Sequence, residues 1–300
     1  MKLARERPRR AAVEPSEPKW GPGDPGCMTR TVLVTGSSSG IGRATARAFL
    51  EEDWTVYATA RDTEDVADLA EEGCETAQLD VTDREQCEAV VGRIEDEHGA
   101  VDCLVNNAGF GQHGPVEDIP TRLVERQFDV NVYGPHRLML AVLPGMREQG
   151  NGTIVNVSSA AGRVSAPGVG VYAGSKFALE AMTDALRNEV DGLGIDVVLV
   201  EPGPVATDFE DRATSEMDRL DRTPAYEAVY RFYEDGSLLS GDGPIASSPE
   251  EVAAVILEAG VSTDPRARYP VGVVGVLSGY ARLLPDRLTD TAYRLVERVL

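Results

Sequence analysis

Lysine is nearly absent from this chain of 300 residues. Only Lys2, Lys19 and Lys176 occur among 29 basic residues, so arginine carries almost all of the positive charge. An arginine guanidinium is wide, planar and permanently charged, whereas a lysine ammonium is a compact point charge that exchanges protons readily. The one lysine outside the N-terminal segment therefore indicates a position that requires an ammonium.

Cysteine is also scarce, and neither of its common structural uses is indicated. Cys27, Cys74, Cys87 and Cys103 form no CxxC pair, and no secretion signal precedes them. We therefore expect reduced, mostly buried thiols in a cytoplasmic protein rather than a disulfide framework. The three histidines are scattered without metal-ligand spacing, which predicts structural roles and no metal site.

Positive charge is in deficit, and long apolar runs are missing. Fifty acidic residues against 29 basic ones give a formal net charge of −21, which repels nucleic acid and anionic membranes. No apolar run reaches the length of about 18 residues that a membrane span requires. An acidic, lysine-poor chain is typical of a salt-rich, halophilic cytosol, where close charges stay screened. The alternative is a GC-rich genome that favours arginine codons.

The chain divides into a tail and one domain. Residues 1–27 are rich in proline and arginine and have no apolar periodicity, which predicts a disordered N-terminal tail. From residue 28 to 300, short β-branched runs such as TVLVTG, TVYATA and TIVNVSS (153–159) alternate with helical patterns. Such alternation predicts an α/β fold, a doubly wound parallel sheet with helices on both faces. The strands are continuous apolar runs, so both faces of the sheet should be buried.

Residues 208–248 separate this pattern from the next predicted helix. A connection of this length in a compact domain is usually functional, which favours a lid over a substrate pocket. Aromatic residues lie within it at partly helical spacing: Tyr226, Tyr230, Phe232 and Tyr233. The alternative is a surface helix pair that covers the sheet edge.

A glycine-rich turn joins the first predicted strand to the first predicted helix. In TGSSSGIG, Gly36, Gly40 and Gly42 allow the backbone to approach a pyrophosphate closely, and the helix N-terminus supplies free N–H groups. The spacing is GxxxGxG rather than the more common GxGxxG. It predicts a dinucleotide site.

Two later strand ends bear on the identity of the dinucleotide. Asp80 and Val81 follow the third strand, where the aspartate can accept from an adenine amino group or cap a helix. After the second strand, Arg61 can accommodate a ribose 2′-phosphate, whereas the following Asp62 suits a free 2′-hydroxyl. The sequence favours NADP(H), with NAD(H) possible.

Tyr172 and Lys176 lie four residues apart in a helical segment and therefore project from one face. A close ammonium stabilises a phenolate, so Lys176 is expected to lower the pKa of Tyr172 and make it a usable acid/base. Ser159 ends the strand TIVNVSS, where its hydroxyl can hold a carbonyl or hydroxyl oxygen. Ser158 is the competing candidate, because consecutive strand side chains face opposite sides.

The chain resembles the short-chain dehydrogenase/reductase family over about residues 30–210. The motifs that carry the resemblance are TGSSSGIG, NNAG (106–109), Ser159, Tyr172, Lys176 and PGPVAT (202–207). The resemblance implies a Rossmann-like fold with about seven strands and a bound NAD(H) or NADP(H). It also implies a Ser-Tyr-Lys centre, completed by Asn131, whose backbone carbonyl would hold a water linked to the lysine. Within the family, the chain is most similar to the branch of 17β-hydroxysteroid and retinol dehydrogenases in three segments: VYATAR, EPGPVAT and RYPVG.

The resemblance also assigns the cofactor contacts. Many NADP-preferring relatives carry a basic residue just before the second glycine, where this chain has Ser39, so Arg61 alone would bind the phosphate. The expected cofactor-binding residues are Gly36, Ser38, Ser39, Gly40, Ile41, Gly42, Arg61, Asp80, Val81, Asn107, Ala108, Gly109, Tyr172, Lys176, Pro202, Gly203, Val205 and Thr207.

We therefore predict reversible hydride transfer between NADP(H) and a small-molecule secondary alcohol or its carbonyl partner, with a lipophilic substrate. A non-catalytic sensor of NAD(P) with the same fold is the main alternative, and a sugar-nucleotide epimerase or dehydratase is a second. Members of the family are often dimers or tetramers, so a homodimer or homotetramer that pairs the helix bearing Tyr172 with its twin is expected.

Overall fold

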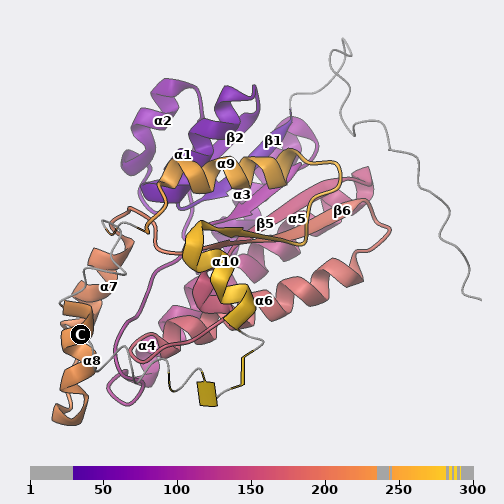
Figure 1. The fold of residues 1–300 in the computed structure, drawn as a ribbon. Coiled ribbons are helices and arrows are strands. Elements are labelled where there is room, and N and C mark those ends of the chain that lie inside the picture. The colour runs from indigo at the N-terminus through magenta and orange to yellow at the C-terminus, as the bar shows by residue number, and fades with distance from the viewer. Residues whose placement is uncertain are drawn as a thin grey trace, which may run out of the picture.

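The computed structural model describes residues 30–234, 243, 245–281, 284, 285, 287, 288 and 291. The predicted tail at 1–27 lies outside them. Seven strands form one parallel sheet in the order β3-β2-β1-β4-β5-β6-β7, which confirms the predicted Rossmann-like fold (Figure 1). The strands are β1 (Thr31–Thr35), β2 (Thr55–Ala60), β3 (Glu75–Gln78), β4 (Cys103–Asn106), β5 (Gly152–Val157), β6 (Ile195–Pro202) and β7 (Arg268–Val271).

Helices cover both faces of the sheet because its central strands are apolar on both sides. In β1, Val32 and Val34 pack into a core with Phe49 of α1 and Ile256 of α9. Leu33 points to the opposite face and joins a core with helices α3 and α5. These helices are α1 (Gly40–Glu51), α3 (Arg84–His98), α5 (Gly134–Gln149) and α9 (Pro249–Val261).

The remaining helices lie along the sheet or beyond its carboxyl edge. The longest, α6, contacts β6 and carries Tyr172 and Lys176. A small separate core of Ile119, Val171, Met217, Leu220 and Tyr230 holds α7 and α8 against the region of α4 and α6. They are α2 (Ala67–Glu72), α4 (Thr121–Phe128), α6 (Gly170–Glu189), α7 (Phe209–Met217), α8 (Glu227–Glu234) and α10 (Gly272–Ala281) (Figure 1).

The strand order changes direction between β1 and β4. The chain leaves β1 towards β2 and β3 and then returns to form β4 on the other side of β1. At such a point the connections diverge and leave a crevice at the carboxyl ends of the strands, where open α/β sheets bind ligands. Among the described residues, no helix is long and apolar enough to cross a bilayer, and no cluster suited to a metal ion occurs.

Candidate active site

A cleft of about 1860 Å³ opens at the carboxyl edge of the sheet. Its walls contain nearly all of the residues predicted from the sequence, although these come from segments spread over about 170 positions of the chain. Gly42 and Asn131 are the two that do not line it. The predicted residues that do are Gly36, Ser38, Ser39, Gly40, Ile41, Arg61, Asp80, Val81, Asn107, Ala108, Gly109, Ser159, Tyr172, Lys176, Pro202, Gly203, Val205 and Thr207.

The glycine turn forms a closely packed cradle at the start of α1. Gly36 and Gly40 have φ angles of +69° and +53°, which favour glycine. A Cβ at Gly42 would lie 2.2 Å from the carbonyl oxygen of Gly36, so only glycine fits there. Ser39 caps α1 with its backbone and makes no side-chain cap hydrogen bond, so the first N–H groups of the helix are left for another acceptor. This arrangement fits a dinucleotide diphosphate.

Replacing Gly42 with alanine should disrupt this cradle. The added methyl group would also lie 2.5 Å from the Asn107 side-chain amide, so the loop must open. We expect a loss of stability of about 1–3 kcal/mol, typical of an overpacked site, and at least tenfold weaker cofactor binding. Thermal unfolding and calorimetric titration with NADPH measure the two effects.

Gly92 in α3 provides the matched control for this substitution. A Cβ there has no atom within 4 Å, so Gly92→Ala should leave cofactor affinity unchanged and stabilise the helix by about 0.5–1 kcal/mol. If Gly42→Ala bound NADPH as tightly as Gly92→Ala, the turn would not be the diphosphate site.

Two strand ends hold the predicted adenosine side of the cleft. Asp80 Oδ1 accepts from the Thr82 amide at 2.9 Å and from the Thr82 hydroxyl at 2.7 Å. The aspartate therefore shapes a turn and lines the cleft at the same time, so both interpretations of the sequence are compatible. Asn107 Nδ2 donates to the carbonyl oxygens of Thr35 and Gly36, which joins the end of β4 to the glycine turn.

The cofactor-selecting position after β2 is occupied by Arg61. Its side chain is exposed at the rim of the cleft, and no carboxylate pairs with it among the described residues. Asp62, which suited a free ribose hydroxyl, instead accepts a hydrogen bond from the Glu64 amide at 3.0 Å and caps a short helical turn. The aspartate is thus engaged by the backbone, while the arginine is left available.

The cleft brings Ser159, Tyr172 and Lys176 together on one wall. Ser159 follows β5. Its hydroxyl accepts from the Ala161 amide at 3.1 Å and lies close enough to the Tyr172 phenol to lower the pKa of that phenol. Ser158 donates instead to the buried Glu180 carboxylate at 2.8 Å, so its hydroxyl is already used. Lys176 Nζ donates to the Val157 carbonyl at 2.9 Å and lies 5.9 Å from the centre of the Tyr172 ring.

The predicted lowering of the Tyr172 pKa by Lys176 is wrong for this structure. Burial raises the pKa of Tyr172 above its usual value, and only the hydrogen bond with Ser159 opposes that rise. Lys176 is itself buried, which lowers its pKa to about 8, and its ammonium is directed at a backbone carbonyl. Desolvation therefore outweighs the expected charge effect, and Tyr172 is a protonated phenol at neutral pH.

Asn131 lies behind this wall, in a π-helical turn over Asp129–Tyr133 that precedes α5. Its buried side chain donates to the Phe110 carbonyl at 3.0 Å and to the Ser175 hydroxyl at 3.2 Å. Asn131 therefore braces the loop after β4 against α6. Water relay by its backbone carbonyl stays a prediction. Such π turns break the regular hydrogen-bond ladder and are frequent at functional sites.

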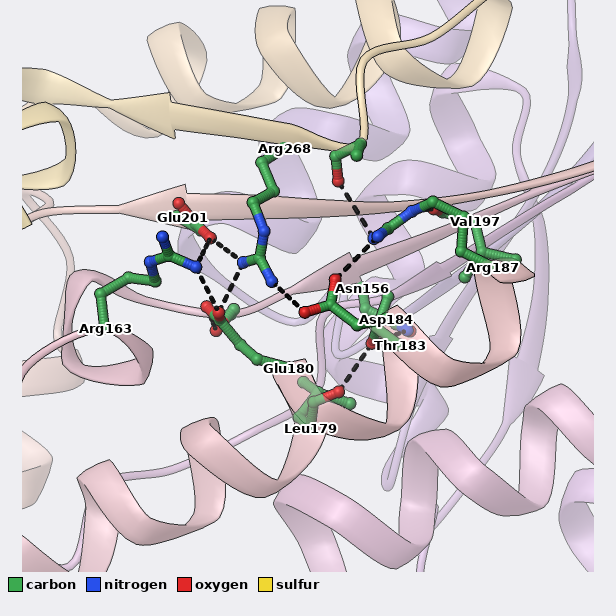
Figure 2. Close-up of polar contacts among 12 residues, drawn as sticks. Asn156, Arg163, Leu179, Glu180, Thr183, Asp184, Arg187, Val197, Glu201 and Arg268 are labelled. Carbon is green, nitrogen blue, oxygen red and sulfur yellow. Dashed lines mark hydrogen bonds and ion pairs between the residues drawn. The ribbon is translucent and has the colours of Figure 1, made fainter. Parts of the chain in front are cut away.

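A cluster of charged side chains links α6 to β6 and to β7 at the edge of the sheet (Figure 2). Arg268 of β7 pairs with Glu180 of α6, Glu201 of β6 and Asp184. Arg163, which follows Ser159, reaches Glu180 at 3.6 Å. The side chains of Glu180 and Glu201 are each 4% exposed, and Glu180 lies one turn beyond Lys176 in α6. The sequence did not indicate this cluster, since residues that pair within it are up to 88 positions apart.

The substrate side of the cleft also contains residues that sequence reasoning missed. His113, expected to be purely structural, lines the cleft together with Phe209 and Glu210. Of the four predicted lid aromatics, Phe232 and Tyr233 line it, whereas Tyr230 is buried with its hydroxyl on Asp118. The Tyr226 hydroxyl bonds Glu117. No local pattern marks His113 or Glu210, because they meet only through tertiary folding.

Comparison with known proteins decides the family. The short chain dehydrogenase family matches residues 30–218 of this chain. The chain belongs to this family. It is similar to the uncharacterized oxidoreductase YbbO of Escherichia coli K12, at 37% identity over 88% of this chain and 93% of that protein. It also resembles a short-chain dehydrogenase structure from Streptomyces avermitilis, at 34% identity and TM-score 0.74, covering 90% of this chain and 97% of the other.

The expected closeness to one branch is only partly supported. Human 17-beta-hydroxysteroid dehydrogenase type 1 is 36% identical over 81% of this chain and 77% of that protein, but uncharacterized oxidoreductases are at least as similar. Similar proteins use either cofactor. A serine dehydrogenase bound to NADP+ shares 27% identity at TM-score 0.70 (81% of this chain, 95% of that one). A short-chain dehydrogenase/reductase from Burkholderia phymatum, in complex with NAD, shares 25% sequence identity with this chain at a TM-score of 0.69. The match covers 80% of this chain and 88% of that one. This short-chain dehydrogenase is therefore an NAD(P)-dependent oxidoreductase.

Proposed function

We propose that this short-chain dehydrogenase uses NADP(H) to interconvert a lipophilic ketone and its secondary alcohol. The observation that carries the proposal is the shared wall of Ser159, Tyr172 and Lys176, facing the glycine turn across one cleft. When bound, NADPH supplies the hydride that the carbonyl carbon accepts. The chain's own residues supply the proton and the position of the reacting oxygen.

Each catalytic residue has a definite task in this scheme. The Ser159 hydroxyl orients the carbonyl oxygen, and the protonated Tyr172 donates its proton to that oxygen as the carbon accepts hydride. The raised pKa keeps Tyr172 protonated at neutral pH, so the proton is in place when a ketone binds. Lys176 is held by the Val157 carbonyl, where its ammonium can contact ribose hydroxyls and stabilise the phenolate that remains.

The substrate half of the cleft supports a lipophilic molecule. The rings of Tyr172 and Phe209 lie 5.6 Å apart, and those of His113 and Tyr233 lie 5.5 Å apart. We assign α7 and α8 as the lid over this half. The predicted lid extends to residue 248, and its residues 235–242 and 244 lie outside the described ones. Loss of reduced-nicotinamide absorbance with a panel of ketones tests the activity. No oxidation of NADPH or NADH by any ketone would contradict it.

Preference for NADP(H) rests on Arg61. Arg61→Ala should raise the KM for NADPH about tenfold or more, since a charge-assisted bond to a phosphate contributes roughly 1.5–3 kcal/mol. The KM for NADH should change little, because NADH has no 2′-phosphate. Steady-state kinetics with both cofactors measure this difference.

Arg84→Ala is the control for Arg61→Ala. Arg84 is an exposed arginine that pairs with Glu88 within α3, outside the cleft. Its removal should leave both KM values unchanged. Equal losses for NADPH and NADH in Arg61→Ala would show that Arg61 does not select the phosphate.

A further inference from the structure

Two polar side chains on the substrate side of the cleft have no role in the chemistry described so far. His113 is 3% exposed, and its Nδ1 has no hydrogen-bond partner within the described part of the chain. Glu210, the second residue of α7, places Oε2 3.8 Å from that nitrogen. This separation is too long for a direct hydrogen bond. A buried polar atom without a partner is costly, so this pair is suited to a ligand.

The pair lies beside the reacting oxygen. The rings of His113 and Tyr172 are 6.0 Å apart, and Phe209 next to Glu210 packs on the same tyrosine. The Glu210 charge is close enough to raise the pKa of Tyr172. A ligand group between His113 and Glu210 would therefore lie within a few bonds of the carbon that accepts hydride.

In one of its two neutral forms, His113 is an acceptor at Nδ1 beside the Glu210 carboxyl group. Burial lowers the pKa of His113 to about 4, so its imidazole is neutral at physiological pH, and the tautomer with its proton on Nε2 leaves Nδ1 as an acceptor. Burial, with a smaller contribution from Asp211, raises the pKa of Glu210 to about 7, so Glu210 is partly ionised at neutral pH and a bound cation would favour its carboxylate form. The nearby arginines are engaged elsewhere, Arg212 with Asp208 and Arg126 with Glu216. A donor that lies between Nδ1 in this form and the carboxylate satisfies both acceptors, and a cation also offsets the Glu210 charge.

We propose that His113 and Glu210 form a subsite for an amino group one or two carbons from the reacting carbon. The substrate is then an amino ketone or the corresponding amino alcohol. An ammonium about 2.9 Å from each acceptor can bridge atoms that are 3.8 Å apart. It would also cancel the Glu210 charge that opposes ionisation of Tyr172. This inference rests on the proposed ketone reduction at the same cleft.

A matched set of ketones tests the subsite. With NADPH, kcat/KM is measured for 2-octanone, 1-hydroxy-2-octanone and 1-amino-2-octanone. The amino ketone should exceed 2-octanone by about tenfold or more, the effect of one charge-assisted hydrogen bond, with the hydroxy ketone between them. Glu210→Gln and His113→Phe should each lower the ratio of amino ketone to plain ketone by about tenfold. Glu227→Gln, the same substitution at an exposed position of α8 outside the cleft lining, should preserve the ratio.

Binding separates failure of the subsite from failure of the proposed function. Calorimetric titration of the NADPH-loaded enzyme, which cannot oxidise an alcohol, compares 1-amino-2-octanol with 2-octanol in wild type and Glu210→Gln. Turnover of ketones without an amine preference, or a preference that both variants retain, overturns the subsite alone. Amine-selective binding that Glu210→Gln abolishes, with no turnover of any ketone, supports the subsite and overturns the reduction. Absence of both turnover and amine selectivity overturns both.

Discussion

Tyr172→Phe should lower kcat by about 10²–10⁴-fold while the affinity for NADPH stays within about twofold of wild type, because the phenol is the proposed proton donor. Phenylalanine keeps the ring that packs on Phe209 and His113, so the fold and the shape of the cleft should be retained. Only the hydroxyl beside Ser159 is removed. Steady-state turnover of a ketone and calorimetric titration with NADPH measure the two quantities separately.

Tyr280→Phe is the matched control for this experiment. Tyr280 in α10 is 67% exposed and lies outside the cleft lining, so loss of its hydroxyl should change neither turnover nor binding. Turnover by Tyr172→Phe at a rate similar to that of Tyr280→Phe would remove Tyr172 from the mechanism. A parallel loss of NADPH affinity would instead show that the substitution had damaged the cofactor site.

Arg268→Met should reduce the free energy of unfolding by about 3–5 kcal/mol near neutral pH, since it removes the main cation that pairs with two buried carboxylates. Glu180 and Glu201 are both 4% exposed, and Arg163 contacts them only at 3.6 and 4.0 Å. Because Glu180 also holds the Ser158 hydroxyl, the change should loosen the segment that carries Ser159. Urea unfolding of wild type and variant measures the loss.

The pH dependence of this loss follows from the carboxylates. Burial and the neighbouring Glu201 already raise the pKa of Glu180, and loss of Arg268 should raise it further in the folded state. A raised folded-state pKa means that the folded protein binds the proton more tightly than the unfolded chain, so acidification stabilises the variant relative to wild type. The deficit should therefore be larger at about pH 8 than at about pH 5.5.

Arg266→Met serves as the control for the charge cluster. Arg266 pairs with Glu258 at the surface, where the two side chains are 67% and 58% exposed. Such an exposed pair contributes about 0–1 kcal/mol, so this variant should remain close to wild type at both pH values. A similar small loss in Arg268→Met would mean that the buried cluster does not stabilise the fold. Arg268→Lys, which keeps one charge, should lie between the two.

The fold and most of the cleft residues could be predicted because their signals are local. The glycine turn must lie where a strand meets a helix, and Tyr172 and Lys176 share a helix face at four-residue spacing. The choice of Ser159 over Ser158 needed the structure, because both follow the same strand. Only the contact of Ser158 with Glu180 shows which hydroxyl is already engaged.

The prediction that Lys176 lowers the pKa of Tyr172 was wrong for a related reason. Spacing along a helix places two side chains on one face but does not state how deeply they are buried. In the folded protein both groups are desolvated, which moves the two pKa values towards the neutral forms. The scarcity of lysine still indicated a special position, and the structure shows the reason in part: the Lys176 ammonium is 6% exposed and binds a backbone carbonyl in a confined site.

By itself the sequence determined the parallel α/β architecture and predicted the dinucleotide turn and the Tyr172 and Lys176 pair of the proposed catalytic wall, because each follows from periodicity and spacing within a short stretch. Only the tertiary structure decided the protonation of Tyr172, the pairing of Arg268 with Glu180 and Glu201, and the meeting of His113 with Glu210. These features depend on desolvation and on contacts between segments about 70–100 residues apart. Packing alone brings such segments together.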